Sequence, residues 1–285
     1  MTTPLETEMP LEQFVRVRDF IYSKLGLFFE DAKVYFIQKR VERRLEALGL
    51  ERVEDYMFHL RFCDTEGHEM QALANLITTN ETYMFREYEQ LEAFSNHCLP
   101  EVLEAKQKRK LTQLRVWSAG CSSGEEPYTL AIILREVLDN SRDWDLQIVA
   151  TDIDEEVLRM AEKALYGDRS VKPVPPEYVE RHLVAERGGH RIHPDTKALV
   201  KLQHLNLHDR AAMRSMRNFD FIFCRNVLIY FDDASRKSVV DHFYNALNPG
   251  GYIFLGHSES IGRISSAFDL VRAGDFLVYK KASHE

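Results

Sequence analysis

The hydrophobic positions of the first ninety residues follow a helical period. Apolar residues lie three or four positions apart in two series, the first being Leu11, Phe14, Val17 and Ile21, and the second Val34, Ile37, Val41, Leu45 and Leu48. Spacing of this kind predicts amphipathic helices that bury one face. We therefore expect an all-helical N-terminal domain over residues 1–85.

The stretch that follows is helical in pattern but more polar. Residues 88–110 read YEQLEAFSNHCLPEVLEAKQKRK. Proline lacks a backbone N–H and disrupts the interior of a helix. We therefore expect a linker helix over residues 86–105 that is broken near Pro100.

From residue 106 onward, short apolar runs alternate with helical segments. The runs are LRVWSAG, LQIVATDI, LVKLQHLNL, FDFIFCRN and GYIFLGHSE, and the helical segments cover residues 126–139, 154–164 and 233–247. Strands that alternate with helices predict a mostly parallel sheet covered by helices on both faces. Residues 106–285 are expected to form a doubly wound α/β domain.

Two segments depart from this alternation. Residues 170–200 contain several prolines and a Gly188-Gly189 pair between RHLVAE and HRIHP, which predicts a small antiparallel β-subdomain inserted into the α/β domain. The final run, FDLVRAGDFLVYKK, predicts a closing β-hairpin.

Composition and charge narrow the class of protein. The chain is 45% hydrophobic and 29% charged, as in ordinary soluble globular proteins. Its net charge of −8 at pH 7 would repel phosphate backbones, so we do not expect a nucleic-acid partner. No apolar run approaches the roughly 18 residues of a membrane span, and the acidic start MTTPLETEMPLEQF is unlike a signal peptide. We expect a cytoplasmic protein without membrane insertion.

Cysteines and histidines offer no metal site by their spacing. The four cysteines are scattered with no C-x-x-C pair, which predicts reduced, buried thiols rather than disulfides or a zinc site. His190 and His193 lie in the expected hairpin of the β-subdomain, without further ligands close in sequence. We therefore expect no metal.

A glycine-punctuated loop, WSAGCSSGEEPY, follows the first predicted strand. In an open parallel sheet, ligands bind beyond the carboxyl ends of the strands. Glu125 and Glu126 stand at the start of the next helix, where they suit the helix dipole but would repel a pyrophosphate. The loop therefore favours S-adenosylmethionine, which carries a sulfonium and an ammonium group and no phosphate. Alternatively, both glutamates only complement the dipole, and the sequence leaves open which of them would contact the cofactor.

The second and third strands also end in polar residues. Asp152 ends the second strand, where a carboxylate can accept both hydroxyl hydrogens of an adenosine ribose. Asp154 is expected to cap the following helix. Asn206 and Leu207 end the third strand and are expected beside the adenine.

The fourth strand ends in the sequence FCRNVLIYF. Arg225 and Asn226 are polar groups at the edge of the sheet, where the methionine part of the cofactor should lie. Tyr230 follows four residues later and can face the same cleft. Val227 stands where amide-nitrogen methyltransferases commonly carry a proline, which argues against a nucleobase or amine substrate.

Five motifs together resemble the CheR family, the chemotaxis receptor glutamate methyltransferases of bacteria. They are TNETYMFR, WSAGCSSGEEPYTLA, ATDID, FIFCRNVLIYFD and LNPGGYIFLGHSES, and they extend through most of the chain. The resemblance implies an all-helical domain followed by a Rossmann-like, S-adenosylmethionine-dependent methyltransferase domain with a small antiparallel β-subdomain. One departure is the apolar Tyr83-Met84-Phe85, where relatives usually carry a pair of phenylalanines.

The resemblance also implies site residues. The cofactor contacts that it implies are Asn80, Thr82, Arg86, Glu125, Asp152, Asn206, Leu207, Arg225 and Asn226. Arg86 and Tyr230 are implied nearest the transferred methyl group, as catalytic residues. Arg86 would hold one oxygen of the substrate carboxylate, and the alternative is an ion pair with Glu81 or Glu87.

The implied reaction converts glutamate side chains on the cytoplasmic helices of receptors to methyl esters. A basic helix face could dock these glutamate-rich helices, or it could be a solvated face paired with neighbouring glutamates; its residues are Lys33, Lys39, Arg40, Arg43 and Arg44. Other candidates are a methyltransferase for nucleic acid or amines, and a non-catalytic regulator that binds S-adenosylmethionine. We expect a monomer, and whether the β-subdomain binds a receptor tail by strand addition stays open.

Overall fold

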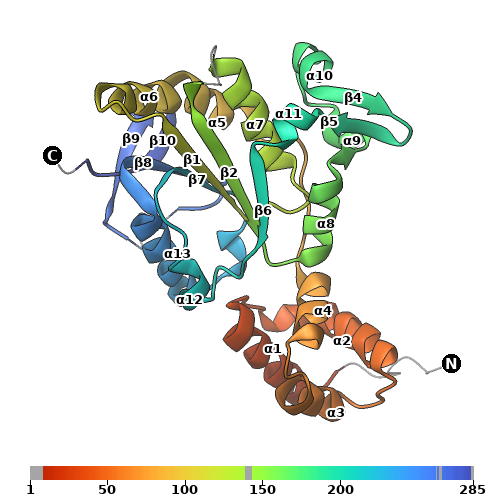
Figure 1. Ribbon diagram of the computed structural model, residues 1–285. Coiled ribbons are helices and arrows are strands. Elements are labelled where there is room, and N and C mark those ends of the chain that lie inside the picture. Colours follow the sequence, from red (N-terminus) through yellow and green to blue (C-terminus); the bar gives the residue numbers. More distant parts are fainter. Residues whose placement is uncertain (1–8, 139–142, 261, 263–264, 284–285) are drawn as a thin grey trace.

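The computed structural model describes residues 9–138, 143–260, 262 and 265–283. A helical N-terminal domain packs below a sheet domain in Figure 1. The four helices of the N-terminal domain are α1 (Leu11–Leu25), α2 (Val34–Leu48), α3 (Val53–Phe58) and α4 (His68–Ile77). The two predicted apolar series form the inner faces of α1 and α2, in which Phe14, Ile21, Ile37 and Val41 are fully buried. The predicted all-helical domain is confirmed.

The linker between the domains is helical from Tyr88 onward, whereas Arg86 and Glu87 lie in a turn. Helix α5 (Tyr88–Ala93), a π-helical turn (Phe94–Cys98) and α6 (Leu99–Lys108) follow one another without interruption. Leu99 keeps right-handed helical angles, φ −65° and ψ −49°, so the expected break near Pro100 is wrong. Pro100 lies in the first turn of α6, where proline is tolerated. The domain ranges 1–85, 86–105 and 106–285 stay predictions.

The sheet of the second domain has seven strands in the order β6-β2-β1-β7-β8-β10-β9. The strands are β1 (Gln113–Ala119), β2 (Asp145–Asp152), β6 (Val200–His204), β7 (Phe219–Cys224), β8 (Leu247–Leu255), β9 (Phe268–Ala273) and β10 (Phe276–Lys281). The first five in spatial order are parallel, and β10 pairs antiparallel with β8 and β9. This is the predicted doubly wound, Rossmann-like sheet with its closing hairpin. The third strand ends at His204, so Asn206 and Leu207 lie just beyond it.

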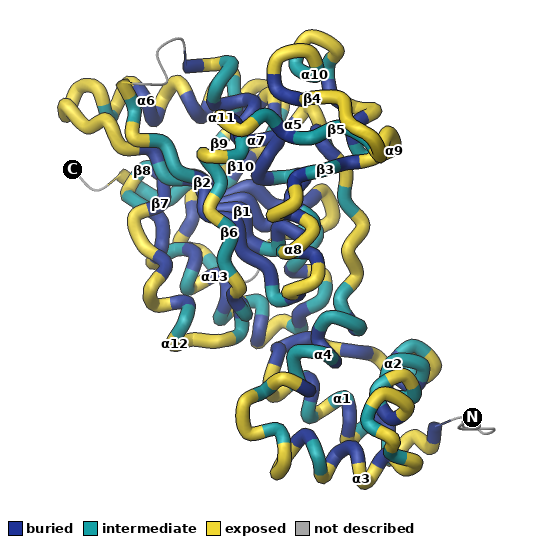
Figure 2. The backbone as a smooth tube through the Cα atoms, turned by 45° about the vertical axis from the view of Figure 1, so that its right-hand side comes forward, coloured by how far each residue is buried: buried dark blue, intermediate teal, exposed yellow. Residues whose placement is uncertain are grey.

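Helices cover both faces of this sheet. The main ones are α7 (Glu125–Val137), α8 (Glu155–Lys163) and α13 (Asp233–Ala246), close to the predicted segments, and the short α12 (Arg210–Met213) was not predicted. Neighbouring residues of β1 point to opposite faces of the sheet. Trp117 packs on Phe243 of α13, whereas Val116 belongs to the cluster that contains residues of α7 and α6. The centre of the sheet is buried from both sides, as the dark blue strands of Figure 2 show.

A second, small sheet projects from the domain. Strands β3 (Leu165–Tyr166), β4 (Leu183–Glu186) and β5 (Gly189–Ile192) pair antiparallel in the order β3-β5-β4. Three short helices accompany them: α9 (Asp168–Val171), α10 (Pro176–His182) and α11 (Pro194–Lys197). The predicted antiparallel insertion is confirmed, although its first strand precedes residue 170.

The four cysteines are all free thiols. Cys98, Cys121 and Cys224 are buried, and burial raises the pKa of the Cys98 thiol to about 12. Cys63 is exposed, so the expectation that all four are buried is wrong. It ends the π-helical turn His59–Cys63 at the domain surface, away from the buried stripe of α3. No helix in the described ranges is long and apolar enough to span a membrane.

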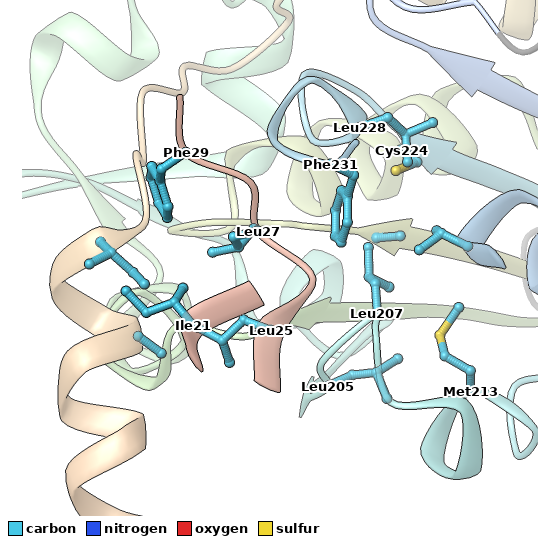
Figure 3. Close-up of a cluster of buried hydrophobic side chains, with 14 of the residues drawn as sticks. Ile21, Leu25, Leu27, Phe29, Leu205, Leu207, Met213, Cys224, Leu228 and Phe231 are labelled. Atoms are coloured by element: carbon cyan, nitrogen blue, oxygen red, sulfur yellow. The ribbon is translucent and has the colours of Figure 1, made fainter. Parts of the chain in front are cut away.

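The N-terminal domain closes over the carboxyl edge of the sheet. Leu27, just after α1, forms a β-bridge with Phe231, and Tyr22 donates a hydrogen bond to Asp232 at 2.9 Å. Figure 3 shows Leu25, Leu27 and Phe29 on one side of an apolar cluster whose other side includes Leu205, Leu207 and Phe231. The two domains therefore share a hydrophobic core at the edge where ligands bind in sheets of this kind.

Candidate active site

A cavity of about 280 Å³ lies at this junction. Its walls come from the end of α1, the 77–86 segment, the loop after β1 and the residues that follow β2, β6 and β7. Among the predicted site residues, those that line the cavity are Asn80, Thr82, Arg86, Asp152, Asn206, Leu207, Arg225, Asn226 and Tyr230. Glu125 is the predicted residue that does not line it. Segments more than 140 positions apart in the chain thus meet around one space.

Two glycines shape the loop after β1. Gly120 and Gly124 have φ angles of +82° and +95°, which glycine adopts far more readily than other residues. A Cβ on Gly120 would lie 2.4 Å from a methyl group of Val227, and one on Gly124 would lie 2.8 Å from the Tyr166 hydroxyl. The loop therefore packs directly on the turn after β7 and on the β-subdomain.

The two glutamates that begin α7 face different ways. Glu125 accepts hydrogen bonds from Ser123 and Ser170, both at 2.7 Å, and so ties the loop to the β-subdomain. Glu126 lines the cavity, accepts a hydrogen bond from Ser118 at 2.6 Å and lies 3.4 Å from Arg225. Burial raises the pKa of the Glu126 carboxyl, and the Arg225 charge opposes this shift. The structure places Glu126, rather than Glu125, at the cavity.

Asp152 is the second carboxylate of the cavity wall. It accepts backbone hydrogen bonds from Ser122 at 2.7 Å and Asp154 at 2.9 Å, and burial raises its pKa. The hydroxyl of Ser122 is buried, lines the cavity and has no hydrogen-bond partner among the described residues. A buried hydroxyl without a partner is costly, so this group is available to a ligand.

Asp154 caps α8 as predicted. Its carboxylate accepts from the backbone N–H groups of Glu156 and Val157. The same carboxylate accepts from the Asn80 side-chain amide at 2.8 Å and from the Thr78 hydroxyl at 2.8 Å. Asp154 thus anchors the segment between the domains at the rim of the cavity.

The backbone around Arg86 is strained. Phe85 and Glu87 both have positive φ angles, 55° and 54°, which cost of order 1 kcal/mol or more for residues other than glycine. The Arg86 guanidinium donates to the Glu81 carbonyl oxygen at 2.8 Å. It forms no ion pair with any carboxylate of the described residues, so the alternative pairing with Glu81 or Glu87 is not found; the Glu81 carboxylate lies 3.7 Å from Arg169 instead. The guanidinium also lies over the Tyr83 ring, 5.8 Å from its centroid, so at the cavity wall its charge has no carboxylate partner among the described residues.

Arg225 is the buried cation of the site. Its side chain is 4% exposed and lies 3.4 Å from Glu126 and 3.3 Å from Glu87. It also donates to the carbonyl oxygen of Arg86. Two carboxylates around one guanidinium leave a net negative charge, to which Asp152 adds another nearby. Such a wall attracts a cationic ligand and repels a phosphate.

Asn206 and Leu207 lie in the turn after β6. The Asn206 side-chain amide donates to the Lys24 carbonyl at 2.9 Å and accepts from the His208 N–H at 2.9 Å. This side chain therefore joins the domains, and the expected place of Asn206 beside the adenine stays a prediction. Leu207 contributes to the apolar part of the cavity wall.

Sequence reasoning missed two groups of residues. The first is the apolar wall from the N-terminal domain, Leu25, Leu27 and Phe29. The sequence LGLFF could have indicated this wall, because its glycine, Gly26, has a φ of +71° and ends α1, and apolar residues follow it directly. The second is Glu87, whose pairing with Arg225, just after β7, has no signal in local sequence.

Comparison with known proteins extends these observations. Residues 80–276 match the family model described as CheR methyltransferase, SAM binding domain, and residues 12–78 match CheR methyltransferase, all-alpha domain. The chain is 41% identical over 260 residues to chemotaxis protein methyltransferase 2 of Vibrio cholerae, covering 91% of this chain and 89% of that one. It is 35% identical to the chemotaxis protein methyltransferase of Klebsiella aerogenes, covering 90% and 86%, and 32% identical to that of Borreliella burgdorferi, covering 90% and 91%.

The matches agree with the geometry of the site. The matched S-adenosylmethionine-binding domain contains the carboxylate-lined wall and the glycine loop, and the matched helical domain supplies the apolar wall. The cofactor is S-adenosylmethionine, whose positive charges suit Glu126, Asp152 and the pocket between them. The chain belongs to the CheR family of S-adenosylmethionine-dependent chemotaxis methyltransferases.

Proposed function

We propose that this enzyme methylates glutamate side chains on the cytoplasmic helices of chemoreceptors, forming methyl esters for adaptation in chemotaxis or a related signalling array. The observation that carries the proposal is the guanidinium of Arg86, which has no carboxylate partner among the described residues and stands at the wall of a carboxylate-lined cavity. An acidic substrate needs such a cation, whereas the cofactor needs the carboxylates. The names of the relatives support the pathway.

The chemistry requires positioning more than proton transfer. A glutamate side chain has a reference pKa of about 4.3, so it is ionised near pH 7 and needs no base. When bound, S-adenosylmethionine supplies an electrophilic methyl group on a sulfonium. One carboxylate oxygen takes the methyl group, the carbon–sulfur bond breaks and no proton moves. We propose that Arg86 holds the other oxygen, that the Tyr230 hydroxyl donates to the substrate and that the apolar wall excludes water.

The proposed cofactor contacts are those of the cavity wall. They are Asn80, Thr82, Arg86, Glu126, Asp152, Asn206, Leu207, Arg225 and Asn226. For Glu125 we propose a supporting role through Ser123 and Ser170, because its carboxylate is engaged there.

Cofactor binding is expected to depend on pH through Glu126 and Asp152. Burial raises the pKa of both carboxyls, so in the free enzyme they bind protons above the usual range. A cationic ligand favours their ionised forms, so its binding releases protons and its affinity weakens as the pH falls below the raised pKa values. By the same linkage, the ligand-free fold loses stability as the pH rises from about 4 through those values.

Calorimetric titration with S-adenosylmethionine between pH 4 and 7, in two buffers of different ionisation enthalpy, measures both the affinity and the protons released. The matched control is Glu126→Gln, which is expected to bind more weakly and with a flatter pH profile. An affinity that stays constant from pH 4 to 7 in the unaltered enzyme would contradict the assignment.

The basic face of α2 has fewer side chains available to a partner than its sequence suggests. Lys39 pairs with Glu42 at 2.8 Å, and Arg44 pairs with Glu69 at 2.7 Å. Arg40 stacks on the Phe36 ring, 3.6 Å from its centroid, and donates to the Leu76 carbonyl beside the cavity. Arg43 forms no ion pair with a described residue, so it is the member most available to a partner. We propose that Arg43, with Lys33, steers glutamate-rich receptor helices toward the site.

Replacing Arg43 with glutamate is expected to raise the KM for receptor by about three- to tenfold, with kcat and S-adenosylhomocysteine affinity unchanged, because a rim charge acts mainly on association. Initial rates at low ionic strength measure this effect. Arg109→Glu, at the far end of α6, is the matched control. Equal changes in the two variants would remove the docking proposal, whereas Arg40→Glu is uninformative because it also breaks packing.

Labelled methyl transfer to a panel of receptors tests the proposed function. We expect label on receptor that mild alkali releases, as esters require. Alkali-stable label would indicate a nitrogen acceptor, and a chain that binds S-adenosylhomocysteine without transferring label would be a regulator. We propose a monomer, and we propose that it lies in the cytoplasm, where thiols such as the four free cysteines stay reduced.

A further inference from the structure

We propose that Glu259 is a positioning residue for methyl transfer: its carboxylate holds the turn after β7 in the conformation that presents Arg225, Asn226 and Tyr230 to the cavity. Glu259 lies in the loop after β8 and does not line the cavity itself. The inference deepens the proposed function, on which it rests for the identity of the acceptor.

Three backbone amides donate to this one carboxylate. Oε2 accepts from the Asn226 N–H at 2.8 Å and from the Gly256 N–H at 2.7 Å, and Oε1 accepts from the Ile229 N–H at 3.2 Å. The Glu259 N–H in turn donates to the Gly256 carbonyl at 2.9 Å. Hydrogen bonds to an ionised acceptor are about twice as strong as neutral ones. Glu259 therefore fastens the β8 loop to both ends of the 226–229 segment.

The conformation that it fastens is not one the chain adopts unaided. Asn226 has a φ of +60°, in the left-handed region that non-glycine residues rarely occupy. Gly256 approaches this residue so closely that a Cβ there would lie 2.9 Å from the Asn226 backbone nitrogen and 2.9 Å from Glu259 Oε2. Strained residues persist only where their surroundings hold them, and here Glu259 and Gly256 are those surroundings.

The turn connects every part of the site. Arg225, at its start, pairs with Glu126 and Glu87 and donates to the carbonyl oxygen of Arg86. At its end, the Tyr230 carbonyl accepts from the Phe28 N–H of the N-terminal domain at 2.9 Å. A shift of the turn would therefore move the cofactor wall, the substrate guanidinium and the domain junction together. Errors of about 1 Å in such positions can reduce turnover by about 10²-fold.

The variant Glu259→Gln tests the proposal, because an amide replaces one acceptor oxygen with a donor that opposes a backbone N–H. We expect kcat for methyl transfer to fall at least tenfold, the S-adenosylhomocysteine affinity to fall several-fold, and the amides of residues 226 and 229 to exchange hydrogen faster. Asp269→Asn, an exposed carboxylate on β9, is the matched control and should stay within twofold in both kcat and affinity.

Glu259→Asp keeps the charge on a shorter side chain, and its kcat and cofactor affinity are expected to lie between those of Glu259→Gln and the unaltered enzyme. This variant keeps the test decisive if the glutamine variant fails to fold. Unchanged kcat and affinity in a folded Glu259 variant would overturn the proposal. So would a lowered melting temperature with kcat per folded enzyme unchanged, because that result indicates a purely structural role. If the unaltered enzyme labels no receptor, the proposed function fails, whereas cofactor affinity and amide exchange still decide the role of Glu259.

Discussion

Replacing Arg86 with alanine is expected to lower kcat for methyl-ester formation by about 10²–10³-fold, the usual cost of removing one preorganised charged donor. The guanidinium forms no ion pair with a described residue, so its charge is available to the incoming carboxylate. S-adenosylhomocysteine affinity should fall much less than kcat, because the cofactor keeps the carboxylate wall and the glycine loop.

Single-turnover transfer of labelled methyl groups to receptor measures this effect, with calorimetry for the cofactor. Arg86→Lys keeps the charge but loses the planar fork, and it should recover only part of the rate. Arg109→Ala is the surface control. A kcat for Arg86→Ala within threefold of the unaltered enzyme would remove Arg86 from the reaction.

Replacing Arg225 with alanine is expected to destabilise the protein by about 3–5 kcal/mol, because it leaves Glu126 and Glu87 as buried carboxylates without their cation. The guanidinium is 4% exposed and is shared by both carboxylates and the Arg86 carbonyl oxygen. Cofactor binding should also be lost, since the wall rearranges when the like charges repel. Urea unfolding followed by circular dichroism measures the stability.

A double variant separates the electrostatic cause from loss of packing. Adding Glu126→Gln to Arg225→Ala removes one of the stranded charges, so it should restore part of the lost stability. If the single variant unfolds at the same urea concentration as Arg109→Ala, the buried charge cluster is not what holds this wall together. If the double variant is less stable than the single one, repulsion between carboxylates is not the cause.

Arg86 and Arg225 both depend on the turn after β7. Arg225 couples this turn to the Arg86 backbone, and Glu259 holds the turn from behind. We therefore expect Glu259→Gln to resemble a mild form of both variants, with a smaller loss of rate and a smaller loss of cofactor affinity.

The sequence by itself determined the architecture and the chemistry of the cofactor. Helical periodicity marked the inner faces of α1 and α2, and alternating apolar runs marked the parallel strands, because burial of one face is a local property of the pattern. Polar residues at strand ends identified Asp152, Arg225 and Asn226, because the carboxyl ends of parallel strands meet at one edge. The acidic glycine loop by itself indicates a cationic ligand.

Only the tertiary structure decided which of these side chains line the cavity. Glu125 and Glu126 are adjacent, and about 100° separates neighbouring residues of a helix, so the packing of α7 had to decide that Glu126 faces the cavity. On the basic face of α2, Arg44 pairs with Glu69, which lies 25 residues away in the sequence. No local pattern reveals this partner. The same holds for Glu87 and Glu259, whose partners lie in the turn after β7 and in the loop after β8. Such pairings depend on how whole elements are oriented against each other, and that orientation is set by the packing of the complete core.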